Sequence, residues 1–300
     1  MVIQLLRYVA GGFFMGAADL VPGVSGGTIA LVLGLYERLV DSIREGSSAL
    51  GSLLTGKRAD SLAHLKTVEW RLLVPLLAGI GLAIVSLSRV LGAQLDSNPT
   101  VMAGGFFGLV VGSILIAWRL VKEPAWLHGL IAVLVGVAMF VVLGLGEEAS
   151  IDSPSLWLFA GAGALAVCAM ILPGISGSLI LLLIGMYSAV LGAVNERDLV
   201  AVGVFAAGAI VGLALFSQLL HWALEQHHDV VLAGLIGLMA GSLRVLWPWP
   251  GGVDSSALGA PADDLGVVVI AGAVGLGLVY VISRLAPAAE DDVSVPLQPA

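Results

Sequence analysis

The hydrophobic pattern of the chain is dominated by long apolar runs that are broken twice by nearly the same short motif. The first break, residues 20–28, reads LVPGVSGGT, and the second, residues 172–178, reads LPGISGS. Proline lacks a backbone N–H and pushes the preceding residue out of the α region, so each motif predicts the end of a helix. The glycines permit a tight turn, and the serines can cap a following helix. Each motif therefore predicts two helices joined by a short loop.

The repeat extends beyond the two breaks. Gly34-Leu35-Tyr36 follows the first motif at the same distance at which Gly185-Met186-Tyr187 follows the second. A later glycine block, residues 105–108, is matched by residues 234–237 in the other half. Glycine spacing alone also serves helix packing in membranes, but two blocks in one order indicate an internal duplication.

The duplication divides the chain into repeats of residues 1–150 and 151–286, followed by a tail, 287–300, whose proline- and acid-rich composition predicts disorder. The ranges expected within the repeats are a hairpin at 3–40, a cytoplasmic loop at 41–71, spans within 72–146, a second hairpin at 155–194 and spans within 199–285. Within the cytoplasmic loop, residues 61–68 are a candidate interfacial helix. The apolar segments beside each break are too short to cross a bilayer of about 30 Å, so both hairpins are expected to be re-entrant. Each repeat is then one hairpin plus three spans.

Composition supports this all-α, polytopic membrane architecture. Hydrophobic residues make up 59% of the 300 residues and charged residues only 11%, with a mean hydropathy of +1.05, which excludes an ordinary soluble domain. Cys168 stands alone, so neither a disulfide framework nor a thiolate metal site is expected. The histidines share no metal-ligand spacing with nearby acids and are interpreted as solvated. No cofactor, metal or nucleic-acid partner is predicted.

The basic residues predict the orientation. Three crossings per repeat is an odd number, so the second repeat is expected to be inverted, as in many secondary transporters. Ten of the 13 basic residues then fall on one side, which should be cytoplasmic. These ten are Arg7, Arg38, Arg44, Lys57, Arg58, Lys66, Arg71, Arg119, Lys122 and Arg284.

The broken backbone is the first candidate for chemistry. At membrane depth, irregular backbone persists only where it is buried in protein or faces a watery cavity. Free N–H groups at a helix start, together with the helix dipole, favour an anion. The predicted anion-binding residues are Ser25, Gly26, Gly27, Thr28, Ser176, Gly177 and Ser178, and the predicted structural breakers are Pro22, Gly23, Pro173 and Gly174. The alternative is a tight structural bend without a ligand.

Five charged residues near the segment ends are further candidates. Asp19 is an ionisable group at membrane depth, so it is a predicted proton or cation site, or an orienter of the loop. Its alternatives are a carboxylate that ties down loop amides or one that pairs with Arg38. Glu37 and Arg38 could form a boundary ion pair or contact a head group. Arg89 and Arg244, near the outer ends of spans, either snorkel or attract an anion that enters from outside.

The first block, residues 16–28 with Gly34-Leu35-Tyr36-Glu37, resembles the signature of the bacterial polyprenyl-phosphate transporter family, and residues 172–177 with Gly185-Met186-Tyr187 resemble its second signature. The resemblance implies a flippase in the bacterial plasma membrane rather than an enzyme. Its lipid partner would be undecaprenyl phosphate, moved from the outer to the cytoplasmic leaflet for carrier recycling in cell-envelope synthesis. The hairpin loops would then cradle the phosphate, Arg89 and Arg244 would recruit it, and Asp19 and Glu37 would tune or couple the cycle.

Two other functions stay open on the residues. Membrane undecaprenyl-pyrophosphate phosphatases share the inverted repeats and a Pro-Gly-x-Ser loop, but Ser25 has no basic neighbour to activate it as a nucleophile. A secondary transporter of small organic anions would have the same architecture.

Overall fold

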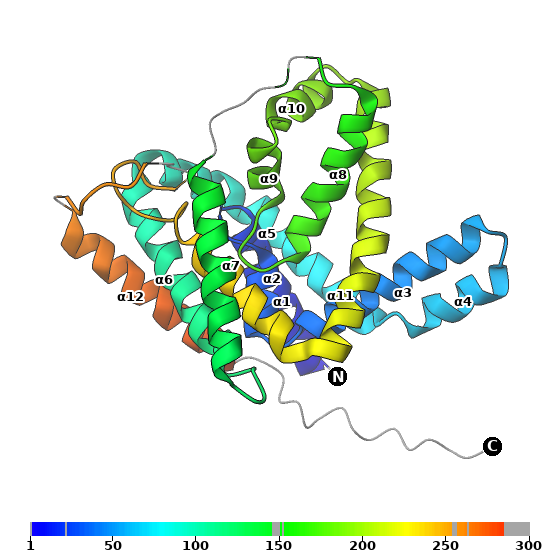
Figure 1. Cartoon of the computed structure of the whole chain (residues 1–300), viewed down its shortest axis with the longest axis horizontal. Coiled ribbons are helices and arrows are strands. Elements are labelled where there is room, and N and C mark those ends of the chain that lie inside the picture. The colour runs from blue at the N-terminus through cyan, green and yellow to red at the C-terminus, as the bar shows by residue number, and fades with distance from the viewer. Residues whose placement is uncertain are drawn as a thin grey trace.

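The computed structural model describes residues 2–21, 23–145, 151, 153–253, 257–262 and 264–284. Every regular element in these ranges is a helix (Figure 1), so the predicted all-α class is confirmed. The predicted breaker Pro22 and the predicted tail, 287–300, lie outside the described residues.

The first hairpin consists of α1 (Val2–Asp19), the short α2 (Gly26–Val32) and α3 (Tyr36–Leu54), and α4 (Arg58–Thr67) follows. Helix α4 covers most of the candidate helix at 61–68, whereas the extension of α3 to Leu54 replaces a stretch that was predicted as loop. Although this stretch is polar overall, α3 is amphipathic. Its apolar residues recur at helical spacing, and Val40 and Ala49 are buried. Figure 1 shows α3 and α4 projecting together from the side of the helix bundle.

The second hairpin consists of α8 (Leu156–Ile171), α9 (Gly177–Leu183) and α10 (Tyr187–Asn195). The seven residues of α9 span only about 10 Å, and the axis bends by 113° between α9 and α10. Neither helix alone can cross a bilayer, which favours the predicted re-entrant path.

The backbone geometry of the two hairpins matches at the repeated glycines. Gly23 and Gly174 have φ of +78° and +84°, and Gly34 and Gly185 have φ of +67° and +71°. At the second pair the helix ends in the same way: the N–H of Leu35 bonds to Ala30 O at 2.9 Å, as the N–H of Met186 bonds to Leu181 O at 2.8 Å. This is a Schellman ending, which needs glycine in the left-handed region. The repeated sequence therefore produces a repeated local structure.

In the part of the chain that the structure describes, five helices are long and apolar enough to cross a membrane, so this is a multi-pass membrane protein. They are α5 (Trp70–Ser97), α6 (Pro99–Trp118), α7 (Trp126–Gly144), α11 (Leu199–Ser242) and α12 (Leu265–Arg284). The 44 residues of α11 cover two predicted spans, which join at a sharp break at His227 instead of a loop.

The spans pack through small residues, which let two backbones approach closely. Helix α1 packs on α5 and α8 packs on the first part of α11, while α6 packs on α12 and α7 on α11. A Cβ added to Gly12 would lie 2.1 Å from Leu76 O, and one added to Gly275 would lie 2.0 Å from Gly105 O. The last two helix pairs join the two sequence halves.

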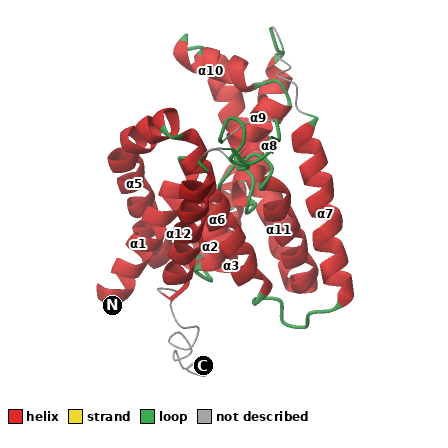
Figure 2. Cartoon of the chain, turned by 90° about the vertical axis from the view of Figure 1, so that its left-hand side faces the viewer, coloured by secondary structure: helices red, strands yellow, loops and turns green. Residues whose placement is uncertain are grey.

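The two hairpins enter from opposite ends of the molecule. Figures 1 and 2 place the N-terminal end of α1 at one end and α10 at the other. This arrangement favours the inverted repeat, which stays a prediction.

Candidate functional site

The two broken hairpins meet at their tips. Thr28 Oγ1 accepts a hydrogen bond of 3.0 Å from the N–H of Gly174, and Ser25 Oγ donates to Met170 O at 3.4 Å. A Cβ on Gly27 would lie 2.8 Å from Ile171 O, so only glycine permits this approach. The sequence-predicted loops are thus brought together, tip against tip.

The first tip satisfies its own helix-start amides. Asp19 Oδ1 accepts from the N–H of Gly26 at 2.6 Å, Ser25 Oγ accepts from Gly27 at 3.1 Å, and Ser25 O accepts from Thr28 at 2.9 Å. Ser25 is 2% exposed and Thr28 is fully buried. Asp19 therefore ties down the loop amides, one of its predicted alternatives, and supplies a negative charge where an anion was expected.

The second tip is more open. The Ser176 and Ser178 hydroxyls lie 2.7 Å apart, and both residues are half-buried. Within the described ranges, the N–H groups of Gly177 and Ser178 have no hydrogen-bond partner. Met170 stands where the first repeat has Asp19, so no carboxylate closes this helix start. The two tips are equivalent in backbone path but differ in free hydrogen-bond donors.

Glu37 and Arg38 do not pair with each other. Arg38 instead holds Glu69, with Nε 3.1 Å and Nη2 2.5 Å from Oε2, and its Nη1 donates to the Tyr8 hydroxyl at 3.2 Å. Glu37 Oε1 lies 2.9 Å from Nε2 of His228 on α11. The predicted Arg38 partners, Asp19 and Glu37, are thus both engaged elsewhere. Glu69 is 31 residues from Arg38 in sequence, a distance at which no local pattern reveals the pair.

The two predicted recruiting arginines have different surroundings. Arg89 is exposed on α5. The guanidinium carbon of Arg244 lies 4.7 Å from the centre of the Phe140 ring, a cation–π contact. Val245 packs against Gly23, where a Cβ would meet its methyl group at 2.6 Å. The segment that carries Arg244 therefore adjoins the first tip, whereas its guanidinium is held against α7.

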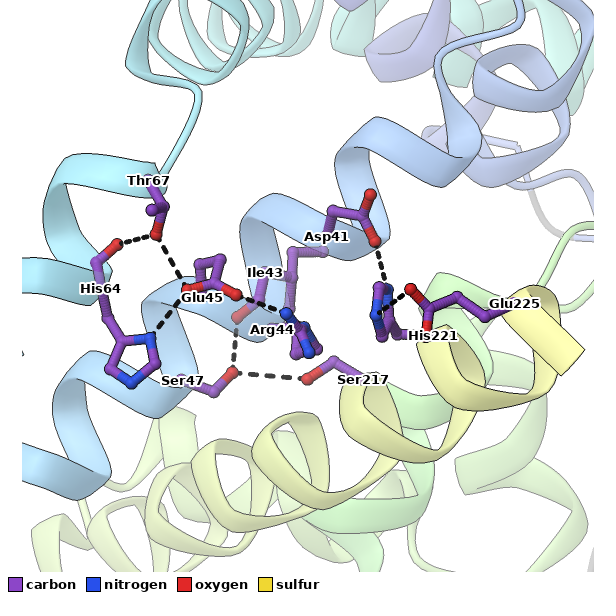
Figure 3. A network of polar contacts seen from close by, with 10 residues as sticks. All are labelled: Asp41, Ile43, Arg44, Glu45, Ser47, His64, Thr67, Ser217, His221 and Glu225. Carbon is purple, nitrogen blue, oxygen red and sulfur yellow. Dashed lines mark hydrogen bonds and ion pairs between the residues drawn. The ribbon is translucent and has the colours of Figure 1, made fainter. Parts of the chain in front are cut away.

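Three of the five histidines, His64, His221 and His228, lie against carboxylates, contrary to the prediction that they are solvated, whereas His227 is exposed as predicted. Figure 3 shows α3 between α4 and α11, with His221 of α11 between Asp41 of α3 and Glu225, and Ser217 beside Ser47. The side chain of His221 is only 15% exposed. The spacing of four residues between His221 and Glu225 was a usable local signal. Across the described residues, no group of three or more His, Cys, Asp or Glu side chains is arranged so that it could hold a metal ion.

Glu45 fastens α4 onto α3. Its Oε2 lies 2.8 Å from His64 Nδ1 and accepts from Thr67 Oγ1 at 2.9 Å, and its Oε1 lies 2.5 Å from Arg44 Nη2 (Figure 3). The hydrogen bond with His64, followed by those with Thr67 and Arg44, holds the pKa of Glu45 below its ordinary value of 4.5.

Acid is therefore expected to release α4 from α3. Because the folded pKa of Glu45 is lowered, its stabilisation is fully present above the unfolded pKa and is lost as the pH falls through the folded value. Amide hydrogen exchange of α4, corrected for the intrinsic rate, should rise as the pH falls below 4.5, the ordinary pKa of the group. In Glu45→Gln this acid-dependent rise should be absent. Equal pH dependence in both proteins would contradict the assignment.

Comparison with known proteins places the chain in a family. The model of a family described as undecaprenyl phosphate translocase-like matches residues 15–258, which include both hairpin tips, the whole second hairpin and the spans α5, α6, α7 and α11. The chain belongs to this family. No solved structure gives a significant match.

Two curated relatives support this membership. A polyprenyl-phosphate transporter of Vibrio cholerae is 40% identical over 241 residues, covering 79% of this chain and 76% of the relative. A polyprenyl-phosphate transporter of Staphylococcus aureus is 32% identical over 256 residues, covering 79% of this chain and 84% of the relative. The resemblance drawn from the two sequence motifs is confirmed.

Proposed function

We propose that the chain transports a polyprenyl phosphate, undecaprenyl phosphate, from the outer to the cytoplasmic leaflet of the bacterial plasma membrane. Family membership and the names of the two relatives support the substrate class. The observation that carries the proposal is the contact of two broken hairpins, entering from opposite ends, at tips that hold backbone N–H groups and hydroxyls. Such broken helices at a repeat interface form the substrate site in many secondary transporters.

The phosphate is proposed to bind at the tips, first at the open one. Ser176, Gly177 and Ser178 offer two hydroxyls and two unpartnered N–H groups. At the first tip, the donors of Gly26 and Gly27 are occupied by Asp19 and Ser25. They become available to phosphate only when Asp19 and the Ser25 hydroxyl release them. Separation of the tips would in addition break the contact between Thr28 and Gly174. The conformation described here is therefore assigned as the closed state of the cycle.

Within this proposal the two arginines keep their predicted role, and the other charged residues take roles that follow from their contacts. Arg89 and Arg244 attract the phosphate at the outer leaflet, Asp19 competes with it at the first tip, and Glu37 and Arg38 tie α3 to its neighbours. The isoprenoid tail stays in lipid, because only the charged head group is costly to move through the hydrocarbon region.

Hydrolysis is disfavoured by the surroundings of Ser25. Its hydroxyl donates to Met170 O and accepts from the Gly27 N–H, and neither group is a base that could activate a nucleophile. We infer that the protein is a transporter and not a phosphatase.

Vesicles that contain the purified protein test the function. Undecaprenyl phosphate placed in one leaflet should become accessible in the other much faster than in protein-free vesicles. No inorganic phosphate should be released from undecaprenyl pyrophosphate. Lipid movement no faster than in the protein-free vesicles would reject the proposal. Release of phosphate would show that the protein is a phosphatase. If small organic anions inhibit lipid movement and are themselves transported, the protein is an anion exchanger.

A further inference from the structure

A cavity of about 440 Å³, lined by both charged and apolar side chains, lies away from the hairpin tips, between α1, α3 and the start of α5. The side chains that carry the argument are Gln4, Tyr8, Arg38, Glu69, Trp70 and Arg71. Trp70 begins the α5 span and is half exposed, as expected of a residue at the membrane interface. The cavity therefore lies at the membrane surface, at the end predicted to be cytoplasmic.

The charges of the cavity favour an anion. Two guanidinium groups, those of Arg38 and Arg71, line it together with one carboxylate, that of Glu69. Arg38 presents its planar fork to Glu69, the geometry that also suits a phosphate. The Tyr8 hydroxyl, which accepts from Gln4 Nε2 at 3.0 Å and from Arg38, adds a further polar group to the wall.

The carboxylate that occupies the Arg38 fork is displaceable. The side chains of Arg38 and Glu69 are 30% and 40% exposed, so an oxyanion can reach the pair from solvent. A phosphate monoester carries more negative charge than a carboxylate and three acceptor oxygens. It can therefore replace Glu69 at the Arg38 fork while Arg71 neutralises the second charge.

The position matches the end of a transport path. Arg89 lies on the same helix as Arg71, about 27 Å further along at 1.5 Å per residue. This separation is close to the thickness of the hydrocarbon core, about 30 Å. Leu5 and Trp70, both partly exposed at the cavity, could face the isoprenoid chain while the phosphate is bound.

We propose that this cavity is a second phosphate-monoester site, where the head group is held at the cytoplasmic surface before release and Glu69 is the internal competitor that displaces it. The proposal rests on the proposed function and deepens it. Arg38 and Arg71 bind the phosphate oxygens, and return of Glu69 to Arg38 expels the lipid.

Binding of farnesyl phosphate to the purified full-length protein, measured by calorimetry in detergent, tests the site. Glu69→Gln keeps the side-chain shape and removes the competing charge, so the dissociation constant should fall about fivefold. Arg71→Gln should raise it about tenfold. The matched control is Arg58→Gln, an exposed arginine on α4 that does not line the cavity and should leave binding unchanged. Thermal unfolding of each variant verifies that the fold is retained.

Two further arms separate the ligand sources and the role of Glu69. Inorganic phosphate should bind much more weakly than farnesyl phosphate, and equal affinity would make this a free-phosphate site and overturn the link to the lipid. In vesicles, Glu69→Gln should bind lipid more tightly yet transport it more slowly, a combination that loss of a purely structural ion pair would not produce.

The inference is overturned if Glu69→Gln weakens binding or leaves it unchanged, or if Arg71→Gln behaves as Arg58→Gln does. If either of these results is obtained while the unmodified protein transports the lipid, the cavity is not a phosphate site and the proposed function is retained. Cavity-dependent binding without any transport would reject the function and retain the site.

Discussion

Gly275→Ala is expected to separate α6 from α12 and to destabilise the protein by about 3 kcal/mol or more, at the upper end of the cost of overpacking a core. The added Cβ would lie 2.0 Å from the backbone oxygen of Gly105, and a backbone atom cannot move aside as a side chain can. The midpoint of unfolding in detergent micelles should fall accordingly.

Gly277 provides the matched control on the same helix. No atom lies within 4 Å of the position that its Cβ would take. Gly277→Ala should therefore be neutral or stabilising by up to about 1 kcal/mol, the difference in helix propensity between the two residues. If both variants unfold at the same midpoint, the close approach of α6 and α12 is wrong.

Ser176→Leu is expected to abolish detectable binding of undecaprenyl phosphate at the hairpin tips. The leucine side chain removes one hydroxyl and covers the adjacent N–H groups of Gly177 and Ser178, so three donors of about 1 kcal/mol each are lost. Together they correspond to a loss of affinity of about 100-fold. Native mass spectrometry of the purified protein with added lipid counts the bound lipids, and Ser176→Leu should hold one fewer than the unmodified protein because the cavity beside Arg71 is unaffected.

Ser88→Leu is the control for this experiment, because Ser88 is an exposed serine on the α5 span. It should bind lipid as the unmodified protein does. Ser178→Ala, which removes a single hydroxyl, should reduce affinity by a smaller factor. Unchanged binding in Ser176→Leu would remove the second tip from the proposed site.

The breaks and their repetition could be predicted from sequence because proline and glycine act locally. The positive φ of Gly23, Gly34, Gly174 and Gly185 follows from residue type, and the matching helix ends follow from it. The apolar spans were equally readable, because length and hydropathy alone decide whether a helix can cross a bilayer.

What the sequence did not indicate depends on tertiary contact. Residues 41–54 were predicted as part of a loop because their serines and charges are typical of connections, yet they form most of α3, which packs on α4 and α11. The histidine partners of Asp41 and Glu37 lie more than 170 residues away. The closure of the first tip by Asp19 was one of several predicted alternatives, and only the 2.6 Å contact with Gly26 decides among them.

Helices of the first repeat pack on helices of the second, and this affects the order in which the chain can assemble during synthesis. Helices α6 and α7 enter the membrane during synthesis before α11 and α12, the helices on which they pack, exist. Until then the glycine-rich faces of α6 and α7 are exposed to lipid, and their small residues offer little surface for packing against an incorrect helix. If the chain is divided between α7 and α8 and both fragments are produced together, they should assemble into active protein. Either fragment alone would expose an unpaired helix-packing face and be degraded.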